Sequence, residues 1–476
     1  MKEKAKKIGI QSISAVLFFL ILWGWTGMTG LQAQGQAFRM PAYETFTLEN
    51  GLTIYLMEQH EVPLIYVSAV FPAGAIHDGN RCGLASLTSE GLLMGTKNYS
   101  KAKIEEELDI LGVSYNAGAS LETSEVFMSF LNSHRDTVFP ILKEIITEPV
   151  FEQTEFDKRK KRLLLELEQA KEAPENVIGD YYNKFLFKNH AYGNPVPGTR
   201  SSVEKITVED LKTFYKNNYL PQGSVIALVG DFKNPEMKEQ ITGLFKDWQG
   251  KPAAVAETPV SAALPLADKP RVLLVNKEDA TETQFIIGSF GITRNNPDYI
   301  GILLINTILG DRFTSWLNDE LRVNAGLTYG VRSRFNPFKA SGTFTINSFT
   351  RTATTVQALD LAVKVLNRLH KQGVDENTLS SAKNYVKGQF PLDYETPDSL
   401  AELLASMFFY KFSDSFINDF QKNIDAVTPE KAKEIIAKYF PVKNLQFVLI
   451  GKASELRDQV KKYGEITEKE IKADGF

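Results

Sequence analysis

Residues 206–230 read ITVEDLKTFYKNNYLPQGSVIALVG, and residues 427–451 read VTPEKAKEIIAKYFPVKNLQFVLIG. In both stretches a threonine, Thr207 or Thr428, precedes acidic residues. This combination predicts a capped helix start, because the hydroxyl accepts from an orphan backbone N–H and carboxylates favour the positive end of the helix. The apolar run that ends each stretch predicts a buried strand. The recurrence of this helix and strand indicates that the chain is built from two copies of one unit.

The beginnings of the two halves match more loosely. Residues 52–56 and 64–70 predict two strands, and residues 272–275 and 283–288 repeat that pair. Helices are then predicted over 101–111, 137–146, 152–171 and 177–187 in the first half, and over 299–309, 354–372 and 376–389 in the second. Strand pairs, helices and a closing strand predict an α+β fold of two tandem homologous domains, each a mainly antiparallel sheet packed with helices.

The two halves are separated by residues 251–270, which read KPAAVAETPVSAALPLADKP. Alanine and proline dominate this stretch, and such a composition suits an extended connector and supplies no core. We therefore expect domains at 40–250 and 271–476.

The N-terminus has the three-part pattern of a secretory signal peptide. Four lysines among residues 2–7 precede an apolar run over 13–25, and small or polar residues follow as far as Ala33. The run is short for a membrane span, which needs about 20 residues. We expect residues 1–33 to be cleaved from an exported, periplasmic or extracellular protein, with an uncleaved N-terminal membrane anchor as the alternative. Cleavage would leave no stable membrane insertion.

Composition excludes several classes of protein. The chain has 476 residues, 43% hydrophobic and 24% charged, which is ordinary for a globular protein. Its formal net charge is −4, and removal of residues 1–33, with four lysines and one glutamate, makes it −7. A nucleic-acid partner is not expected, because such binders carry a basic domain. Cys82 is the only cysteine, so paired-thiol chemistry is excluded.

Motifs that carry catalysis are missing from the sequence. No two of the five histidines, His60, His77, His134, His190 and His370, are spaced as the i, i+4 pair of a helical zinc site. His77-Asp78 is the only adjacent His–acid pair, and a packing role is favoured for it. The sequence contains neither a phosphate-binding glycine loop nor a G-x-S-x-G nucleophile motif.

Two other segments resemble a known family. Residues 83–96 read GLASLTSEGLLMGT and are similar to the signature helix of the insulinase/pitrilysin metallopeptidases, which include the mitochondrial processing peptidases. Active members of that family read G-[LI]-A-H-x-x-E-H at this place. The tandem halves, the linker and residues 192–199, YGNPVPGT, also resemble the family. The resemblance covers essentially the whole chain after the signal peptide.

The metal motif of the family is degenerate here. Ser86 and Glu90 stand where the resemblance places two histidines, and Ser89 stands where it places the glutamate base. Glu166 or Glu168 would match the third metal ligand. Zinc sites need three strong ligands, and neutral serine hydroxyls are poor substitutes. We therefore expect no metal cofactor in this chain and interpret the helix as structural, with four leucines packed in the core: Leu84, Leu87, Leu92 and Leu93.

The second segment lies in the other half. Residues 321–331 read LRVNAGLTYGV and resemble the family's L-R-x-x-x-G-L-A-Y-x-V element. In active members the arginine and tyrosine hold the substrate backbone and its oxyanion, which implies substrate binding by Arg322 and Tyr329. Spacing alone favours a structural alternative, in which Arg322 caps a helix or pairs with Glu320 and Tyr329 faces the sheet.

A lost metal motif with a retained arginine–tyrosine pair is typical of the non-catalytic partner in two-subunit members of the family. The resemblance thus implies a substrate-binding subunit, inactive alone, that forms a heterodimer with a zinc-bearing homologous subunit and processes or degrades peptides. The zinc is expected in the partner. A non-enzymatic peptide-binding or scaffold protein is the alternative.

Overall fold

The computed structural model describes residues 38–250, 263–265 and 267–476. The expected signal peptide, residues 1–33, lies outside the described residues, as does most of the expected linker, at 251–262 and 266.

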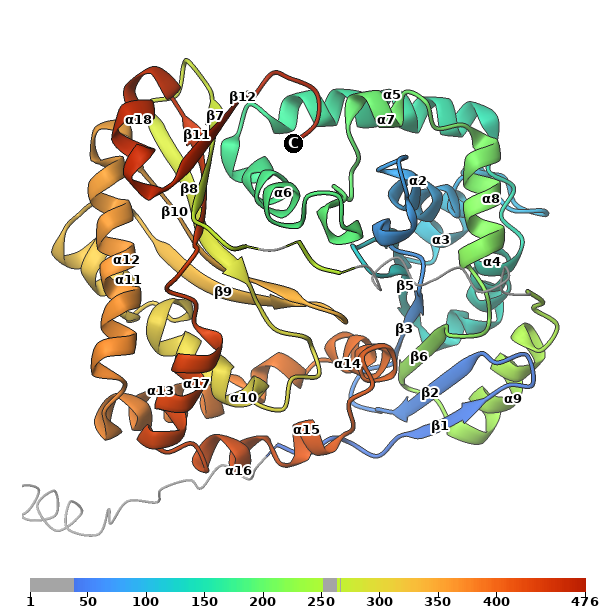
Figure 1. The fold of residues 1–476 in the computed structure, drawn as a ribbon. Helices are drawn as coiled ribbons and strands as arrows, with labels where there is room; N and C mark the ends of the chain where they lie inside the picture. Colours follow the sequence, from blue (N-terminus) through green and yellow to red (C-terminus); the bar gives the residue numbers. More distant parts are fainter. Residues whose placement is uncertain (1–37, 251–262, 266) are drawn as a thin grey trace, which may run out of the picture. The chain divides into compact units, whose positions relative to one another are not determined.

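The first sheet has six strands in the order β1-β2-β6-β3-β5-β4 (Figure 1). Along the chain they are Glu44–Thr47 (β1), Thr53–Glu58 (β2), Leu64–Phe71 (β3), Ser114–Ala119 (β4), Ser124–Leu131 (β5) and Val225–Gly230 (β6). Strand β6 is parallel to β2, and the other neighbours are antiparallel. Strand β6, the last of the first half in sequence, is therefore inserted between β2 and β3.

The second sheet has the order β12-β7-β11-β8-β10-β9, and its last five strands repeat the order of β2-β6-β3-β5-β4, while the edge strand β12 comes from the end of the chain. Its strands are Arg271–Asn276 (β7), Glu282–Phe290 (β8), Val331–Pro337 (β9), Gly342–Arg351 (β10), Gln446–Gly451 (β11) and Glu465–Glu470 (β12). Strand β7 is parallel to both β11 and β12, and the remaining pairs are antiparallel. Two similar, mainly antiparallel sheets with helices confirm the predicted α+β fold.

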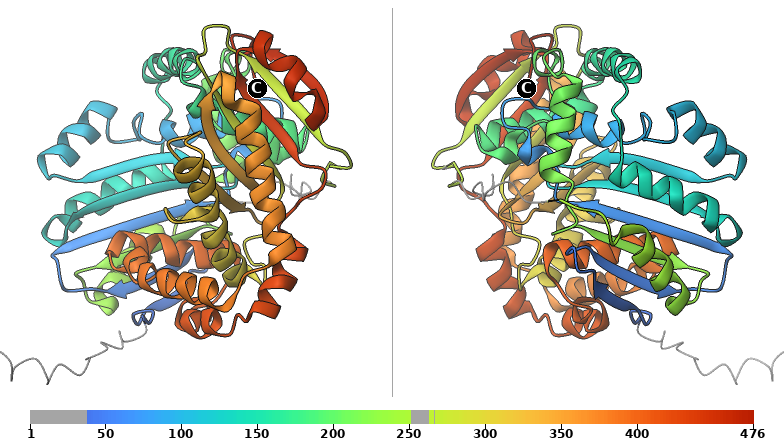
Figure 2. Two further views of the ribbon diagram at one scale, coloured as in Figure 1. Left: turned by 90° about the vertical axis from the view of Figure 1, so that its left-hand side faces the viewer. Right: turned by 90° about the vertical axis from the view of Figure 1, so that its right-hand side faces the viewer.

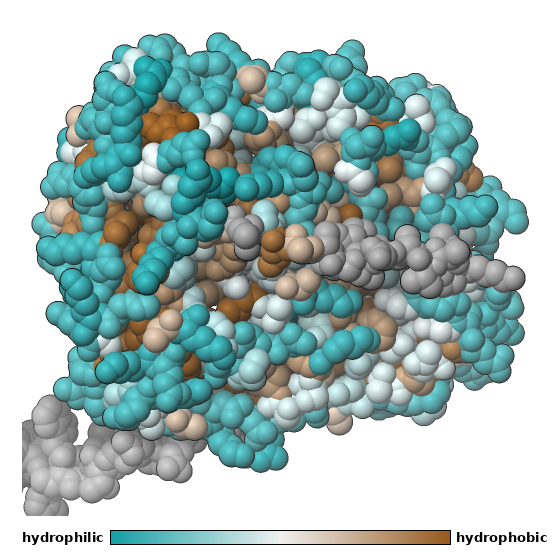
Figure 3. All heavy atoms as spheres, viewed as in Figure 1, coloured by the Kyte–Doolittle hydropathy of each residue, from teal (hydrophilic) through white to brown (hydrophobic). Residues whose placement is uncertain are grey.

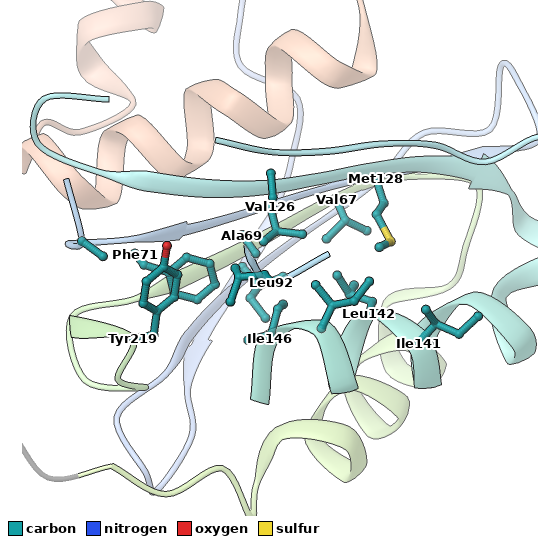
Figure 4. Packing of buried hydrophobic residues seen from close by; sticks show 14 of the residues in the cluster. Val67, Ala69, Phe71, Leu92, Val126, Met128, Ile141, Leu142, Ile146 and Tyr219 are labelled. Carbon is teal, nitrogen blue, oxygen red and sulfur yellow. The ribbon is translucent and has the colours of Figure 1, made fainter. Parts of the chain in front are cut away.

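The helices of the first half are Leu84–Gly91 (α2), Lys101–Ile110 (α3), Arg135–Thr147 (α4), Gln153–Ala170 (α5), Pro174–Phe187 (α6), Arg200–Val203 (α7), Val208–Asn218 (α8) and Asn234–Phe245 (α9). All of them except α6 bury apolar side chains in the core of the first sheet. Figure 4 shows Leu142 and Ile146 of α4 directed toward Val67 of β3 and Val126 of β5, all of them buried. Burying one such side chain stabilises the fold by about 1.5–3 kcal/mol.

Helices of the second half are Tyr299–Asn306 (α10), Trp316–Asn318 (α11), Thr355–Gln372 (α12), Glu376–Gln389 (α13), Pro397–Tyr410 (α14), Ser415–Asn418 (α15), Phe420–Asp425 (α16), Pro429–Tyr439 (α17) and Ala453–Val460 (α18). The long helix α12 lies in front of the second sheet in the left-hand view of Figure 2. Helix α10 continues as a π-helical turn, Thr307–Asp311, where the sequence predicts a regular helix to residue 309.

Two helices pack on the sheet of the opposite half. Helix α6 contacts β8 and β11, and α14 contacts β3 and β6. The buried hydroxyl of Tyr182 on α6 lies 3.2 Å from the carbonyl oxygens of Ser289 and Phe344. A Cβ on Gly288 would stand 2.4 Å from the same hydroxyl, so only glycine admits this close approach.

The face of the protein seen in Figure 3 is mostly hydrophilic, with hydrophobic residues gathered in its hollows. Within the part of the chain that the structure describes, no helix is both long and apolar enough to span a membrane.

Candidate functional site

Helix α2 carries the degenerate metal motif, and a buried carboxylate fixes its beginning. The Asp78 carboxylate accepts hydrogen bonds from the backbone N–H groups of Gly83 and Ala85, both at 2.8 Å. Burial raises the pKa of Asp78 to about 7, and these backbone bonds oppose that rise. Gly83 has φ +96°, a left-handed conformation that favours glycine. Asp78 of the His77-Asp78 pair thus serves as a cap for α2.

The apolar side of α2 is part of the core, as predicted. Leu84 and Leu87 of the helix and Leu92 just after it are buried, while Leu93 is partly buried against the same cluster. Ser89 is fully buried and its hydroxyl faces the phenol of Tyr219, whose pKa burial raises to about 12. Because the Ser89 side chain has no access to solvent, it cannot contact a substrate.

Glu90 and Glu166 are brought together by a residue that the sequence analysis missed. Arg159 of α5 places Nη2 3.0 Å from Oε1 of Glu90 and Nη1 3.0 Å from Oε2 of Glu166. Its Nε also donates to Glu90, so that contact is bidentate. Ser86 lies beside them, with Oγ 3.5 Å from Oε1 of Glu90. The sequence offered one signal for the Arg159–Glu166 ion pair. The two residues are seven apart, so on one helix they lie on the same face two turns apart.

The structure also distinguishes the two candidates for the third ligand. Glu168 forms an ion pair with Arg200 of α7 and does not take part in the Arg159 contacts. Of the two candidates, Glu166 is therefore the one that lies with the degenerate motif.

The residues present do not fit a zinc ion. The Arg159 guanidinium, 21% exposed, already pairs with both carboxylates, so a divalent cation would have to displace a fixed positive charge. Glu90 and Glu166 raise the pKa of Arg159 above its ordinary value although burial acts to lower it. Among the described residues, no group of three or more His, Cys, Asp or Glu side chains is arranged to hold a metal ion.

A cavity of about 220 Å³ opens beside this cluster. Its lining includes Glu90 and Arg159 together with Tyr115, Asn116 and Ala117 of β4. Strand β4 is at the end of the first sheet, and in the described part of the chain no strand pairs with its outer side. An unpaired edge of this kind can accept an extended peptide as an added strand.

Arg322 and Tyr329 form a second cluster with Phe313. The guanidinium carbon of Arg322 lies 4.3 Å from the ring centroid of Phe313 and 5.0 Å from that of Tyr329. Tyr329 is 79% exposed and Phe313 is 68% exposed, which is unusual for large rings. Stacking between two aromatic faces holds a guanidinium in place while its N–H groups stay available.

Two parts of the structural alternative do not match the surroundings of these residues, although Arg322 does lie in the last turn of the π-helix Asp319–Asn324, where a cation favours the helix end. Glu320 pairs with Arg368 at 2.6 Å rather than with Arg322. Tyr329 precedes β9 and is exposed to solvent rather than packed on the sheet. The loop is fixed by its backbone, since the N–H of Leu327 donates to the carbonyl of Leu321 at 2.8 Å.

The β9 edge of the second sheet is less accessible to an added strand than the β4 edge of the first sheet. Strand β9 takes the place that β4 has in the first sheet, but side chains cover its backbone. The N–H of Val331 donates to Oδ1 of Asn318 at 3.1 Å, and Nδ2 of Asn306 donates to the carbonyl of Ser333 at 3.0 Å. These amides occupy groups that an added strand would need.

Comparison with known proteins agrees with this architecture. The family model described as insulinase (peptidase family M16) matches residues 54–200, and the model described as the peptidase M16 inactive domain matches residues 205–386. The chain belongs to the insulinase, or M16, peptidase family.

Relatives in that family have different names. The chain is 24% identical to the non-peptidase homolog YmxG of Helicobacter pylori over 83% of this chain and 90% of that protein. It is 23% identical to the uncharacterized zinc protease YmxG of Bacillus subtilis, over 83% and 95%. It is 22% identical to the mitochondrial-processing peptidase subunit beta of Bos taurus, over 92% and 90%.

Two solved structures share the fold. A peptidase M16 inactive domain from Pseudomonas fluorescens is 27% identical with a TM-score of 0.80, covering 86% of this chain and 98% of that one. A protease from Helicobacter pylori has a TM-score of 0.79 at 18% identity, covering 87% and 100%.

Proposed function

We propose that this protein is the non-catalytic, substrate-binding subunit of an exported two-subunit zinc metallopeptidase that acts on peptides. The observation that carries the proposal is the contrast between its two clusters. Arg159 stands between Glu90 and Glu166 where the family motif would hold a metal, whereas Arg322 is half-buried against the exposed ring of Tyr329 and makes no ion pair among the described residues. The zinc and the general base would then come from a homologous partner subunit.

The names of relatives support the two parts of this proposal, namely that the chain is non-catalytic and that it is a subunit of a peptidase. One relative is named a non-peptidase homolog, and another is named a subunit of a processing peptidase. The signal-peptide pattern of residues 1–33 supports a periplasmic or extracellular location, with an N-terminal anchor as the alternative.

Strand β4 is the proposed docking edge for the peptide. Its outer side is free of a neighbouring strand in the described residues, and it lines the same cavity as Arg159. The equivalent edge at β9 is covered by Asn306 and Asn318. Main-chain pairing along β4 would bind extended peptides of many sequences and would not accept a compact folded protein.

Arg322 and Tyr329 would act on the peptide held in the partner's active site. A guanidinium and a phenol both donate hydrogen bonds, and donors of this kind stabilise the negative charge that develops on a carbonyl oxygen during cleavage. Their contribution is greater in the transition state than in the bound substrate, so it affects turnover more than affinity.

The test uses the complex reconstituted by co-expression with a homologue from the same cell that has an intact H-x-x-E-H motif. Because Phe retains the ring, Tyr329→Phe removes only the donor, and we expect kcat to fall by at least about tenfold with a smaller change in KM. Arg322→Lys should also lower kcat, because an ammonium does not reproduce the planar guanidinium fork. Peptide cleavage is measured at saturating and limiting substrate.

Tyr385→Phe is the matched control, since Tyr385 of α13 is 44% exposed and lies outside both clusters. This variant should cleave at the wild-type rate. If Tyr329→Phe and Arg322→Lys assemble and cleave at that rate as well, these residues are structural and the protein is a scaffold homologue, the alternative that the name "non-peptidase homolog" also favours.

A further inference from the structure

A cavity of about 860 Å³ lies over the second sheet, next to α6. Four arginines line it: Arg312, Arg322, Arg332 and Arg334. Two of them come from β9, and the other two come from the segment that precedes it. In Figure 1, β9 and β10 run side by side below α6.

Strand geometry places Arg332 and Arg334 on one face. Their neighbours Val331 and Ser333 are buried, while both arginines are exposed, as the alternation of side chains in a strand requires. Their cross-strand partners on β10 are Asn347 and Thr345, respectively. The floor beside the two guanidinium groups is therefore polar and uncharged.

None of the four arginines takes part in an ion pair within 4.0 Å among the described residues. Arginines elsewhere in the chain do, for example Arg200 with Glu204 and Arg457 with Glu468. Arg312 binds the Ser381 hydroxyl through Nη1 at 3.2 Å, yet its Nε is buried without a hydrogen-bond partner. The four guanidinium groups are therefore not neutralised by a carboxylate of the described chain, and a ligand carboxylate could pair with those that face the cavity.

Three carboxylates also line the cavity: Glu175, Glu282 and Asp311. Glu175 is in the first turn of α6 and Glu282 begins β8, so these two stand on the opposite side from β9. Asp311, next to Arg312, is the one lining carboxylate on the side of β9, where it stands among four arginines. A basic wall in a chain of net charge −4 is complementary to an anionic ligand.

We propose that this arginine groove binds acidic side chains of an extended peptide, and that it thereby sets the substrate class of the complex. The inference rests on the proposed function as a peptide-binding subunit. Residues two apart on a strand are separated by about 6.6 Å, which equals the repeat of alternate side chains in an extended peptide. Arg332 and Arg334 therefore match Asp or Glu at positions i and i+2, each forming a guanidinium–carboxylate pair.

Fluorescence anisotropy on the full mature chain tests the inference. The probes are labelled peptides of equal length that alternate threonine with glutamate, glutamine or lysine. We expect the glutamate peptide to bind at least about tenfold more tightly than the glutamine peptide, with the lysine peptide weakest. The double variant Arg332→Gln/Arg334→Gln should remove that preference and retain the binding of the glutamine peptide.

Arg351→Gln is the matched control, because Arg351 is an exposed arginine at the end of β10 that does not line the groove. An equal loss in this control would show that net charge drives binding, and the inference would be wrong. Equal binding of all three peptides would overturn the acidic preference while leaving the peptide-binding function intact. Binding of none of them would overturn the proposed function as well. Competition by inorganic polyphosphate as strong as by the glutamate peptide would show a general polyanion site instead.

Discussion

Arg159 is the residue on which the interpretation of the first half depends, because its guanidinium joins Glu90 to Glu166. Arg159→Met keeps an apolar stem and removes the charge, so the two carboxylates would face each other without a cation. We expect the free energy of unfolding to fall by about 1–2 kcal/mol in denaturant titrations, since hydrogen bonds to charged groups contribute at this level. Elemental analysis should find no stoichiometric zinc in either protein.

Arg162→Met on the same helix is the control for this change, because Arg162 is exposed and lies one turn away. It should alter stability by less than about 0.5 kcal/mol, as surface substitutions usually do. One tightly bound zinc per wild-type chain, with peptide cleavage sensitive to chelators, would contradict the interpretation of a lost metal site.

Single residues could be predicted from the sequence only when a motif identified them. The motif placed Ser86, Ser89 and Glu90 on α2, and the leucines beside them are in the core. Arg159 belongs to no motif, and its partner Glu90 is far away in the chain. A charge on a helix face gives no information about which distant carboxylate it will meet, so this contact required the structure.

At the scale of elements, the edge of the second sheet yields a prediction about stability. Asn318→Ala removes the acceptor for the N–H of Val331 and leaves that buried donor unpaired. The expected loss in the free energy of unfolding is about 1–3 kcal/mol, the cost of a buried unsatisfied group. Thermal or denaturant unfolding measures it, with Asn377→Ala, an exposed position on α13, as the neutral control. A loss no larger than that of the control would mean that water replaces the amide.

Element positions were largely predictable because they follow periodicity. The predicted helix over 376–389 is the observed α13, and the predicted strand over 64–70 is β3 to within one residue. The order of the strands was not predictable, since β6 enters between β2 and β3 by pairing across a long stretch of sequence. The packing of α14 on the first sheet was missed for the same reason, as an apolar helix face does not specify its partner.

For the whole molecule, the two similar halves carry complementary features, one with a degenerate metal motif and one in which Arg322 is stacked on the exposed Tyr329. If this chain contributes only the arginine–tyrosine pair to catalysis, a homologue must contribute the intact metal motif. Two chains joined for this purpose form an obligate complex, and such interfaces bury more than about 2,000 Å². We therefore expect a one-to-one complex with a zinc-bearing homologue.

Size-exclusion chromatography with light scattering on the co-expressed pair measures this directly. The mass should equal the sum of the two mature chains, with zinc present at one ion per pair and contributed by the homologue. Because an obligate complex has no functional free subunit, we expect the complex to persist on dilution to nanomolar concentration. A protein that stays monomeric beside every zinc-bearing homologue of its own cell would have no active site to complete, and the scaffold function would then be the better account of Arg322 and Tyr329.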